Sequence, residues 1–173
     1  GQAISEYQKC TSILPREPSP YYQIGKIQLY ILNELANAEY YIKEAISLNL
    51  NNEWGYYDLL TIYGIQNNLI KQQDIYEQLI DIDPENQRYY FESIRTLKDL
   101  KQYRPALKLI KKTEKEFGIS NESLLLAKDI YIQQNNLRLK RKAIPNRLLQ
   151  THPKTQPNHY EHGLHKRHQR FHN

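Results

Sequence analysis

Residues 1–137 alternate between apolar stripes and short polar joints. In a helix that buries one face, apolar residues fall at positions i, i+3, i+4 and i+7. One such stripe consists of Tyr56, Leu59, Leu60 and Tyr63, and a second occupies residues 75–82. The polar residues 66–68 separate the two stripes, and the next joint contains Pro84, which lacks a backbone donor and fixes φ. The pattern therefore predicts two helices joined by a tight turn and followed by a break.

The stripes recur with a constant period along the chain. Adding 34 to the number of each residue in the first stripe gives Tyr90, Ser93, Ile94 and Leu97. The second helix of each pair shows the same recurrence, with Ala38, Ile42 and Ala45 corresponding to Gln72, Tyr76 and Leu79, and then to Ala106, Ile110 and Thr113. One more step of 34 reaches Leu124, Ala127, Lys128 and Tyr131, and a backward step of 35 reaches Ala3, Tyr7 and Cys10. Small and large residues return in corresponding slots, as expected for a stacked helical repeat. Ser120 and Asn121 precede the last stripe and are expected to cap its helix.

This arrangement resembles the tetratricopeptide repeat, whose 34-residue helix–turn–helix units follow a W-x2-L-G-x2-Y, A-x3-F, P pattern. The second full unit contains Tyr56-x2-Leu-Leu-x2-Tyr63, then Gln72-x3-Tyr76, then Pro84. The spacing of these residues agrees with the family pattern better than their identities do. Gln72 replaces a small residue, and Gly118 stands where proline is common. The resemblance covers roughly residues 3–137, most of the chain. It implies an all-α fold, a right-handed α-solenoid of stacked helix–turn–helix pairs.

The repeat boundaries give a domain map. Residues 1–137 are expected to form the helical array, with units 1–17 (partial), 18–52, 53–86, 87–119 and 120–137 (partial). Residues 138–173 are expected to form a disordered basic tail. Residues 2–14 correspond to the second helix of a unit whose first helix is absent, so we expect the array to be a fragment of a larger bacterial-type repeat protein that can associate through its uncapped ends.

Stacked helix pairs form an extended concave surface. In the resembling family, peptides or partner helices bind this surface, and the first helix of each pair lines it. Carried over slot by slot, the resemblance implies a partner-binding set of Tyr22, Lys26, Trp54, Tyr57, Asp58, Arg88, Phe91, Glu92, Arg95 and Asp129. Gln23, Thr61, Glu122 and Leu125 occupy neighbouring slots on the same helices.

Aromatic rings beside mixed charges suit a peptide, because rings give contact area at a low entropy cost and arginines bind carboxylates in pairs of hydrogen bonds. An equally weighted alternative is that Trp54 and Phe91 only fill gaps between adjacent pairs. Some members of the family hold a partner's C-terminal carboxylate with a Lys/Asn/Arg set. Tyr57 and Asp58 stand where that set would need basic or amide residues, so this ligand is not predicted.

Charge divides the chain at the same boundary. The net charge of the whole chain is +5, but residues 1–137 carry 15 Lys+Arg and 18 Asp+Glu, a net −3. Residues 138–173 carry 9 Lys+Arg and one acid, a net +8, together with all six histidines. Pro145 is expected to break the helix that continues from the last repeat at about Ile144. A solvated tail is the favoured interpretation. Nucleic-acid binding by its arginines and lysines, or metal binding by its histidines, is the alternative.

Enzymatic chemistry has little support in the repeat region. It contains no histidine, so a Ser-His-Asp or Cys-His arrangement would have to recruit the tail. Cys10 occupies a small slot and is expected to face a neighbouring helix rather than act as a nucleophile. We therefore expect a non-catalytic protein-interaction scaffold without cofactor or bound metal, whose partner is a protein or peptide rather than nucleic acid.

Two expectations concern location. The chain has no apolar run of about 18 residues, so no membrane-spanning helix is predicted. Its content of tyrosine, isoleucine and asparagine resembles that of repeat arrays in bacterial envelope-associated proteins, which favours the periplasm or envelope.

Overall fold

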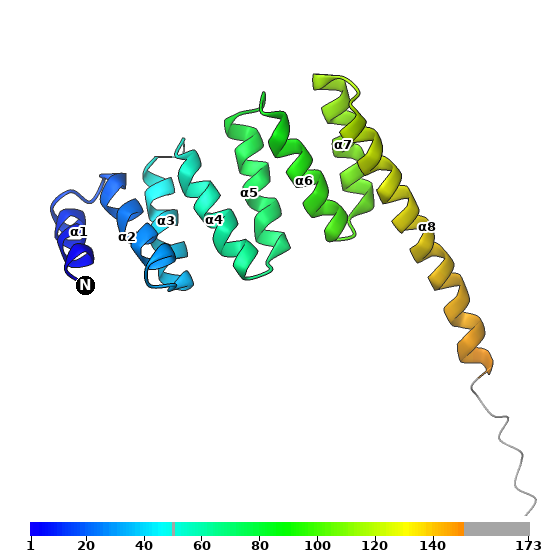
Figure 1. Ribbon diagram of the computed structural model, residues 1–173, viewed down its shortest axis with the longest axis horizontal. Helices are drawn as coiled ribbons and strands as arrows, with labels where there is room; N and C mark the ends of the chain where they lie inside the picture. The colour runs from blue at the N-terminus through cyan, green and yellow to red at the C-terminus, as the bar shows by residue number, and fades with distance from the viewer. Residues whose placement is uncertain (50, 151–173) are drawn as a thin grey trace, which may run out of the picture. The chain divides into compact units, whose positions relative to one another are not determined.

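The computed structural model describes residues 1–49 and 51–150, and its regular secondary structure there is entirely α-helical (Figure 1). The helices are α1 (Gln2–Ile13), α2 (Pro18–Tyr30), α3 (Leu35–Leu48), α4 (Glu53–Ile65), α5 (Leu69–Ile82), α6 (Gln87–Asp99), α7 (Tyr103–Phe117) and α8 (Asn121–Gln150). By its internal contacts the chain divides into residues 1–134 and residues 135–173. Helices α1 to α7 and the first half of α8 belong to the first of these units.

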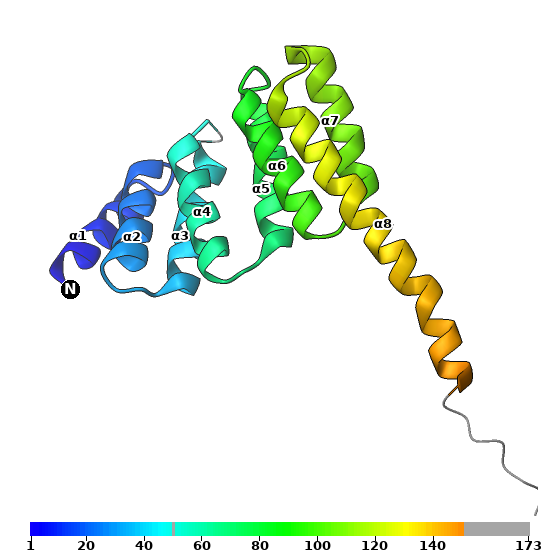
Figure 2. The same ribbon diagram turned by 45° about the vertical axis from the view of Figure 1, so that its right-hand side comes forward.

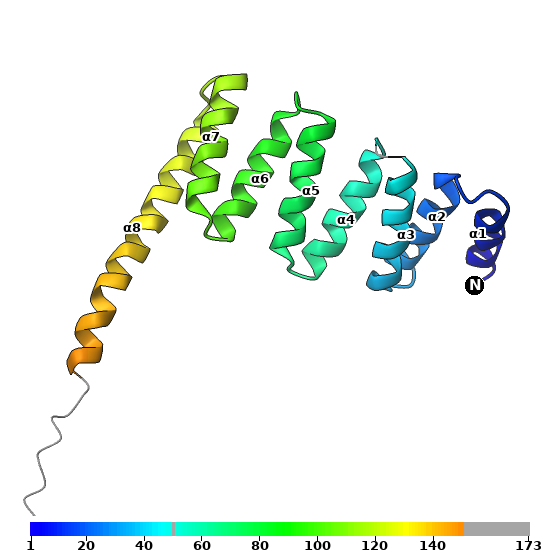
Figure 3. The same ribbon diagram turned by 180° about the vertical axis from the view of Figure 1, so that it is seen from behind.

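Successive helices form antiparallel pairs, α2 with α3, α4 with α5 and α6 with α7 (Figures 1 and 2). Neighbouring pairs are connected by contacts between α3 and α4 and between α5 and α6, and α1 packs on α2. The view from behind shows the same order (Figure 3). The prediction of an all-α stack of helix–turn–helix pairs is confirmed.

The turn inside each pair repeats as regularly as the helices. Asn33, Asn67 and Lys101 adopt positive φ angles of 55°, 52° and 61°, and each lies one full repeat period after the one before it. Asparagine tolerates this left-handed conformation better than most residues, which explains its use in two of the three turns. In the second turn the N–H of Asn68 donates to the carbonyl of Tyr63 at 2.8 Å, as in a Schellman motif. The period therefore fixes the turn geometry as well as the core.

Side-chain caps begin three of the described helices. The Oδ1 of Asn52 accepts a hydrogen bond from the backbone N–H of Gly55 at 3.3 Å at the start of α4. The Oδ1 of Asn68 accepts a hydrogen bond from the backbone N–H of Lys71 at 3.1 Å at the start of α5. The Oγ of Ser120 accepts one from the N–H of Ser123 at 3.1 Å at the start of α8. Such bonds satisfy donors that the first turn of a helix leaves unpaired. The prediction that Ser120 caps the last stripe is confirmed.

The slots that recur with the repeat period form the core. In the three complete pairs most of them are buried, including the small residues that allow helices to approach closely, while Leu60, Gln72 and Tyr76 are half-buried. The buried set includes Ala38, Ile42, Ala45, Tyr56, Leu59, Tyr63, Leu79, Tyr90, Ser93, Ile94, Leu97, Ala106, Ile110 and Thr113. Residue size in these slots decides how closely the helices pack.

Helix α8 uses a different face from the one that the period predicts. Leu124 and Tyr131 are 54% and 51% exposed, whereas Ser123, Leu126 and Ile130 are buried. In α6, Tyr90 of the slot equivalent to Leu124 packs against Phe117 of the second helix of the same pair. The described part of the chain gives α8 no such second helix, and Leu124 and Tyr131 stay exposed.

Cys10 is exposed, and the prediction that it is buried is wrong. None of the α1 residues is fully buried, because α1 packs mainly on α2 through one side. Cys10 lies on the side that remains in solvent.

The predicted break at Pro145 is also wrong, because α8 continues through it to Gln150. Proline removes only the one N–H that would bond to the carbonyl of Arg141, and the turns on either side keep their own bonds. Residues 138–150, which were assigned to the disordered tail, are therefore part of a helix. Residues 151–173, with all six histidines, lie outside the described residues, and the predictions of disorder, nucleic-acid binding and metal binding fall there.

A partly buried polar hub connects α3, α4 and α5. The Oε1 atom of Glu39 accepts hydrogen bonds from Lys43 Nζ at 2.7 Å, Tyr63 Oη at 2.9 Å and Lys71 Nζ at 2.8 Å. Burial alone would raise the pKa of Glu39, but the three donors outweigh it and lower the pKa from 4.5 to about 2. The ionised carboxylate therefore stabilises the packing of these three helices.

Glycine permits the closest helix approach, between α2 and α3. A Cβ atom added to Gly25 would lie 2.6 Å from Ile42 Cγ1 and 3.2 Å from the Ile42 backbone nitrogen. Ile42 is fully buried and cannot move away. Gly64 in α4 differs, because its added Cβ would meet only the Nε2 atom of the flexible Gln72 side chain, at 3.3 Å.

The substitution Gly25→Ala is expected to destabilise the array by about 1–3 kcal/mol, because overpacking forces α2 and α3 apart. The matched change Gly64→Ala should be neutral or stabilising by up to about 1 kcal/mol, because alanine favours the helix interior. Urea denaturation followed by circular dichroism measures both values. Equal effects of the two substitutions would contradict the close approach at Gly25.

The Glu39 hub predicts a pH dependence of stability. Because the pKa of Glu39 is lower in the folded chain than in the unfolded one, its contribution is complete above about pH 5 and is lost as the pH falls from 4.5 to about 2. Glu39→Gln should therefore make the free energy of unfolding less dependent on pH in this window. Glu6→Gln is the control, because Glu6 pairs with Lys9 at an exposed site and should leave the dependence unchanged.

Candidate functional site

The predicted partner-binding residues lie on α2, α4, α6 and α8, the first helices of successive units. Trp54 is 71% exposed, Arg88 and Asp129 are accessible, and Tyr22, Lys26, Tyr57, Glu92 and Arg95 are half-buried. Asp58 and Phe91 are buried. The eight accessible members are called the first-helix surface below.

An aromatic row crosses from α4 to α6. The rings of Trp54 and Tyr57 meet edge to face, with centroids 6.1 Å apart. The hydroxyl groups of Tyr57 and Tyr89 are hydrogen-bonded at 2.7 Å, and their rings lie 6.4 Å apart. Because Tyr89 is buried, it holds Tyr57 in place and Tyr57 in turn supports the exposed indole of Trp54. Tyr89 was not predicted as part of this site.

Asp58 is buried and bonds to a neighbouring helix of its own chain. Its Oδ1 atom accepts a hydrogen bond from the hydroxyl of Tyr30, which joins α4 to α2. Burial and the neighbouring Asp58 carboxylate raise the pKa of Tyr30 to about 12, and the same causes raise the pKa of Tyr22. Both tyrosines therefore stay neutral. The prediction that Asp58 binds a partner is corrected, because only 6% of the residue is exposed.

Phe91 is corrected in the same way. Only 5% of the residue is exposed, so its ring fills space inside the array, which is the alternative that the sequence left open. Trp54, in contrast, is 71% exposed and does not fill space inside the array. The two aromatic residues therefore have different roles, although both were predicted from the same repeat pattern.

Arginine and carboxylate groups connect α6 to α8. The guanidinium of Arg95 donates to Glu92 Oε1 at 2.9 Å and also to Glu122 Oε1. The arginine that was expected to bind a partner's carboxylate is therefore already paired with two carboxylates of its own chain. Among the described ion pairs, Arg88 takes part in none. On α2, Lys26 Nζ lies 5.6 Å from the centre of the Tyr22 ring.

The slots of Asp58 and Tyr89 recur with the repeat period, but their residues are not uniformly buried. In the slot of Asp58, Ile24 and Leu126 are buried and Glu92 is half-buried. In the slot of Tyr89, Gly55 and Ser123 are buried and Tyr21 is half-buried. Both slots lie beside the predicted stripe, and Asp58 and Tyr89 bond to the preceding pair. Tyr30 lies at the end of α2, and no repeat pattern indicates its bond to Asp58.

Two further features are absent from the described residues. No helix there is both long enough and apolar enough to cross a membrane. No group of three or more His, Cys, Asp or Glu side chains in this part of the chain is arranged to hold a metal ion.

Comparison with known proteins gives structural matches only. No family model and no curated protein matches the chain. YrrB, a TPR protein described as having an unusual peptide-binding site, aligns with 76% of this chain and 68% of its own, at 17% identity and a TM-score of 0.51. The TPR2B domain of yeast Sti1, solved in a complex with pHsp70, aligns with 67% of this chain and 97% of its own, at 17% identity and a TM-score of 0.47.

The TPR domain of Arabidopsis OM64 aligns with 67% of this chain and 95% of its own, at 16% identity and a TM-score of 0.47. The likeness to YrrB agrees with the buried slots and left-handed turns that recur with the repeat period. The chain thus has the fold of a tetratricopeptide-repeat array.

Proposed function

We propose that this protein is a non-catalytic interaction module that binds a peptide or a segment of a partner protein along the first-helix surface. The observation that carries the proposal is the exposure of Trp54, an indole that is 71% accessible and rests edge to face on Tyr57. Indole rings are enriched among the residues that dominate protein interfaces, because they bury a large area with few rotatable bonds. An exposed, supported tryptophan on a repeat scaffold suits that role.

The surroundings of Trp54 favour a particular kind of peptide. Arg88 occupies the equivalent slot on α6 and has no ion-pair partner among the described residues, so its guanidinium can receive a carboxylate. Tyr57 is fixed by its bond to Tyr89 and needs no reordering when a ligand arrives. We therefore propose a peptide with an apolar side chain for Trp54 and a nearby carboxylate for Arg88. Arg95 is already paired with Glu92 and Glu122, so Arg88 is the cation proposed to receive the carboxylate.

The likeness to YrrB supports the proposal at the level of the fold, because that protein is described as having a peptide-binding site. Nothing in that likeness identifies the partner of this chain. Binding of nucleic acid or metal by the basic tail, association through the array ends and a bacterial envelope location stay predictions from the sequence.

The single tryptophan of the chain allows a direct test. Peptides selected from a random library on the full chain are titrated while tryptophan emission is followed. If the peptide lies on the first-helix surface, it covers Trp54 and shifts its emission to shorter wavelength. Trp54→Ala and Arg88→Ala should each weaken binding by about tenfold or more, as measured by calorimetry.

Lys111→Ala is the matched control, because Lys111 is an exposed cation on α7 and should not affect binding. Circular dichroism confirms that each variant stays folded. Peptides that bind without changing the emission of Trp54, and whose affinity survives both substitutions, would show that the first-helix surface is not the binding site.

A further inference from the structure

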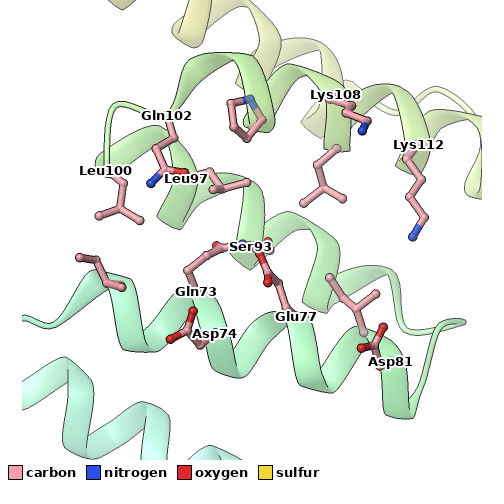
Figure 4. Close-up of a pocket in the computed structure, with 14 residues that line it drawn as sticks. Gln73, Asp74, Glu77, Asp81, Ser93, Leu97, Leu100, Gln102, Lys108 and Lys112 are labelled. Carbon is pink, nitrogen blue, oxygen red and sulfur yellow. Dashed lines mark hydrogen bonds between the residues drawn. The ribbon is translucent and has the colours of Figure 1, made fainter.

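A cavity of about 660 Å³ lies on a different part of the array, between α5 and α7 (Figure 4). Its base is formed by Ser93 and Leu97 of α6, and its sides are formed by residues of α5 and α7. None of the residues of the first-helix surface lines it. Its volume falls within the range of pockets that bind ligands in other proteins.

The cavity exists because the Glu39 hub is not repeated in the next unit. Adding 34 to Glu39, Lys43, Tyr63 and Lys71 gives Gln73, Glu77, Leu97 and Pro105, and all four of these line the cavity. In the preceding unit, Tyr63 of α4 and Lys71 of α5 instead donate hydrogen bonds to Glu39 of α3. The repeat also loses volume at the base, where Ser93 corresponds to Leu59.

A buried polar group at this cavity is incompletely satisfied. Gln73 Nε2 donates to Ser93 Oγ at 2.8 Å and to Glu77 Oε1 at 3.0 Å, which fixes the orientation of the amide. Gln73 Oε1 is buried and has no hydrogen-bond partner in the described part of the chain. In the hub, the equivalent atom of Glu39 accepts three hydrogen bonds. An unsatisfied buried acceptor is destabilising, so this slot lacks the stabilisation that the hub gives to the preceding unit.

The two sides of the cavity carry opposite charge. Asp74, Glu77 and Asp81 lie along α5, and Lys108 and Lys112 lie opposite them on α7 (Figure 4). No described ion pair joins the two sides. Ile80 of α5, Leu97 of α6 and Leu109 of α7 provide apolar surface between them. A ligand that fits this groove needs an apolar stripe with a basic edge and an acidic edge.

We propose that this groove docks an amphipathic helix of a partner protein, whose apolar stripe has Lys or Arg along one edge and Asp or Glu along the other. An extended peptide would bury its backbone N–H and C=O groups against two helices whose own backbone groups are already bonded, whereas a helix brings its backbone bonds with it. From Ile70 to Asp81 the α5 side is about 16 Å long by helical rise, which corresponds to three turns of a docked helix.

The test uses three synthetic helical peptides of about 18 residues, stapled on the solvent face, with the same leucine stripe. One has a lysine edge and a glutamate edge, the second has two lysine edges, and the third has two glutamate edges. Exchanging the edges would be uninformative, because a helix that reverses its direction restores the match. The mixed peptide should bind the full chain at least about tenfold more tightly than either uniform peptide, because each uniform peptide places like charges together on one side.

Reversing the α7 side should reverse the preference. In the double variant Lys108→Glu and Lys112→Glu, the peptide with two lysine edges should bind more tightly than the mixed peptide, an outcome that unfolding cannot produce. Lys111→Glu with Lys115→Glu is the control of equal charge change, since both lysines are exposed on α7 but do not line the groove. It should leave the wild-type order of affinities unchanged.

A third variant closes the groove with the chemistry of the hub. Gln73→Glu, Glu77→Lys, Leu97→Tyr and Pro105→Lys reproduce the arrangement of Glu39, Lys43, Tyr63 and Lys71, and should abolish binding of the mixed peptide while the chain stays folded. Equal affinity of the wild-type chain for all three peptides, or no change of preference in the charge-reversed variant, would overturn the proposal. So would a dimer in sedimentation that disappears in that variant, because the occupant would then be a second copy of the chain.

The first-helix surface provides the remaining comparison. The mixed peptide should leave the emission of Trp54 unchanged and should bind the Trp54→Ala variant with wild-type affinity. A peptide that shifts this emission and loses affinity in that variant lies on the other surface, and the α5–α7 groove would not be its site. The proposal for the groove and the proposal for the first-helix surface can therefore be refuted independently.

Discussion

The structure depends on the burial of each first helix on two sides at once. In α6, Tyr90 packs against Phe117 of its own second helix, with ring centroids 5.3 Å apart, while the adjacent Tyr89 bonds to Tyr57 of the preceding pair. Two neighbouring slots thus face two different partners, and both must be filled with side chains of the right size. Helix α8 is buried on one side only. Ser123 bonds to Glu114 of the preceding α7, while the adjacent Leu124 stays exposed.

The stripe that faces a helix's own partner could be predicted from the sequence, because its residues are apolar or small and recur at a fixed period. Tyr56, Ile94 and Ala106 were found in this way, and all are buried. The slots that face the preceding pair were harder to recognise, because they tolerate polar residues whose hydrogen bonds are made to other helices. Asp58 is the clearest case. A carboxylate is expected to be exposed to solvent, but this one accepts a hydrogen bond from Tyr30.

Other features could not be predicted because they depend on what a helix lacks. Cys10 is exposed since α1 has little to cover it, and Pro145 is tolerated since one missing bond does not end a helix as long as α8. The α5–α7 groove likewise results from residues that are absent: Leu97 where the preceding repeat has Tyr63, and Pro105 where it has Lys71. Constant spacing preserves the fold, and changes of residue within the constant slots create a site of distinct chemistry.

The burial of α1 has a consequence for how the array loses structure. In a linear stack each helix is stabilised only by its neighbours, so local opening costs least where the interface is smallest. None of the α1 residues is fully buried, while α4 and α6 each bury several large side chains. Local opening of α1 is therefore expected to need less free energy than opening of the central pairs, and the backbone amides of α1 are expected to exchange with solvent before those of α4.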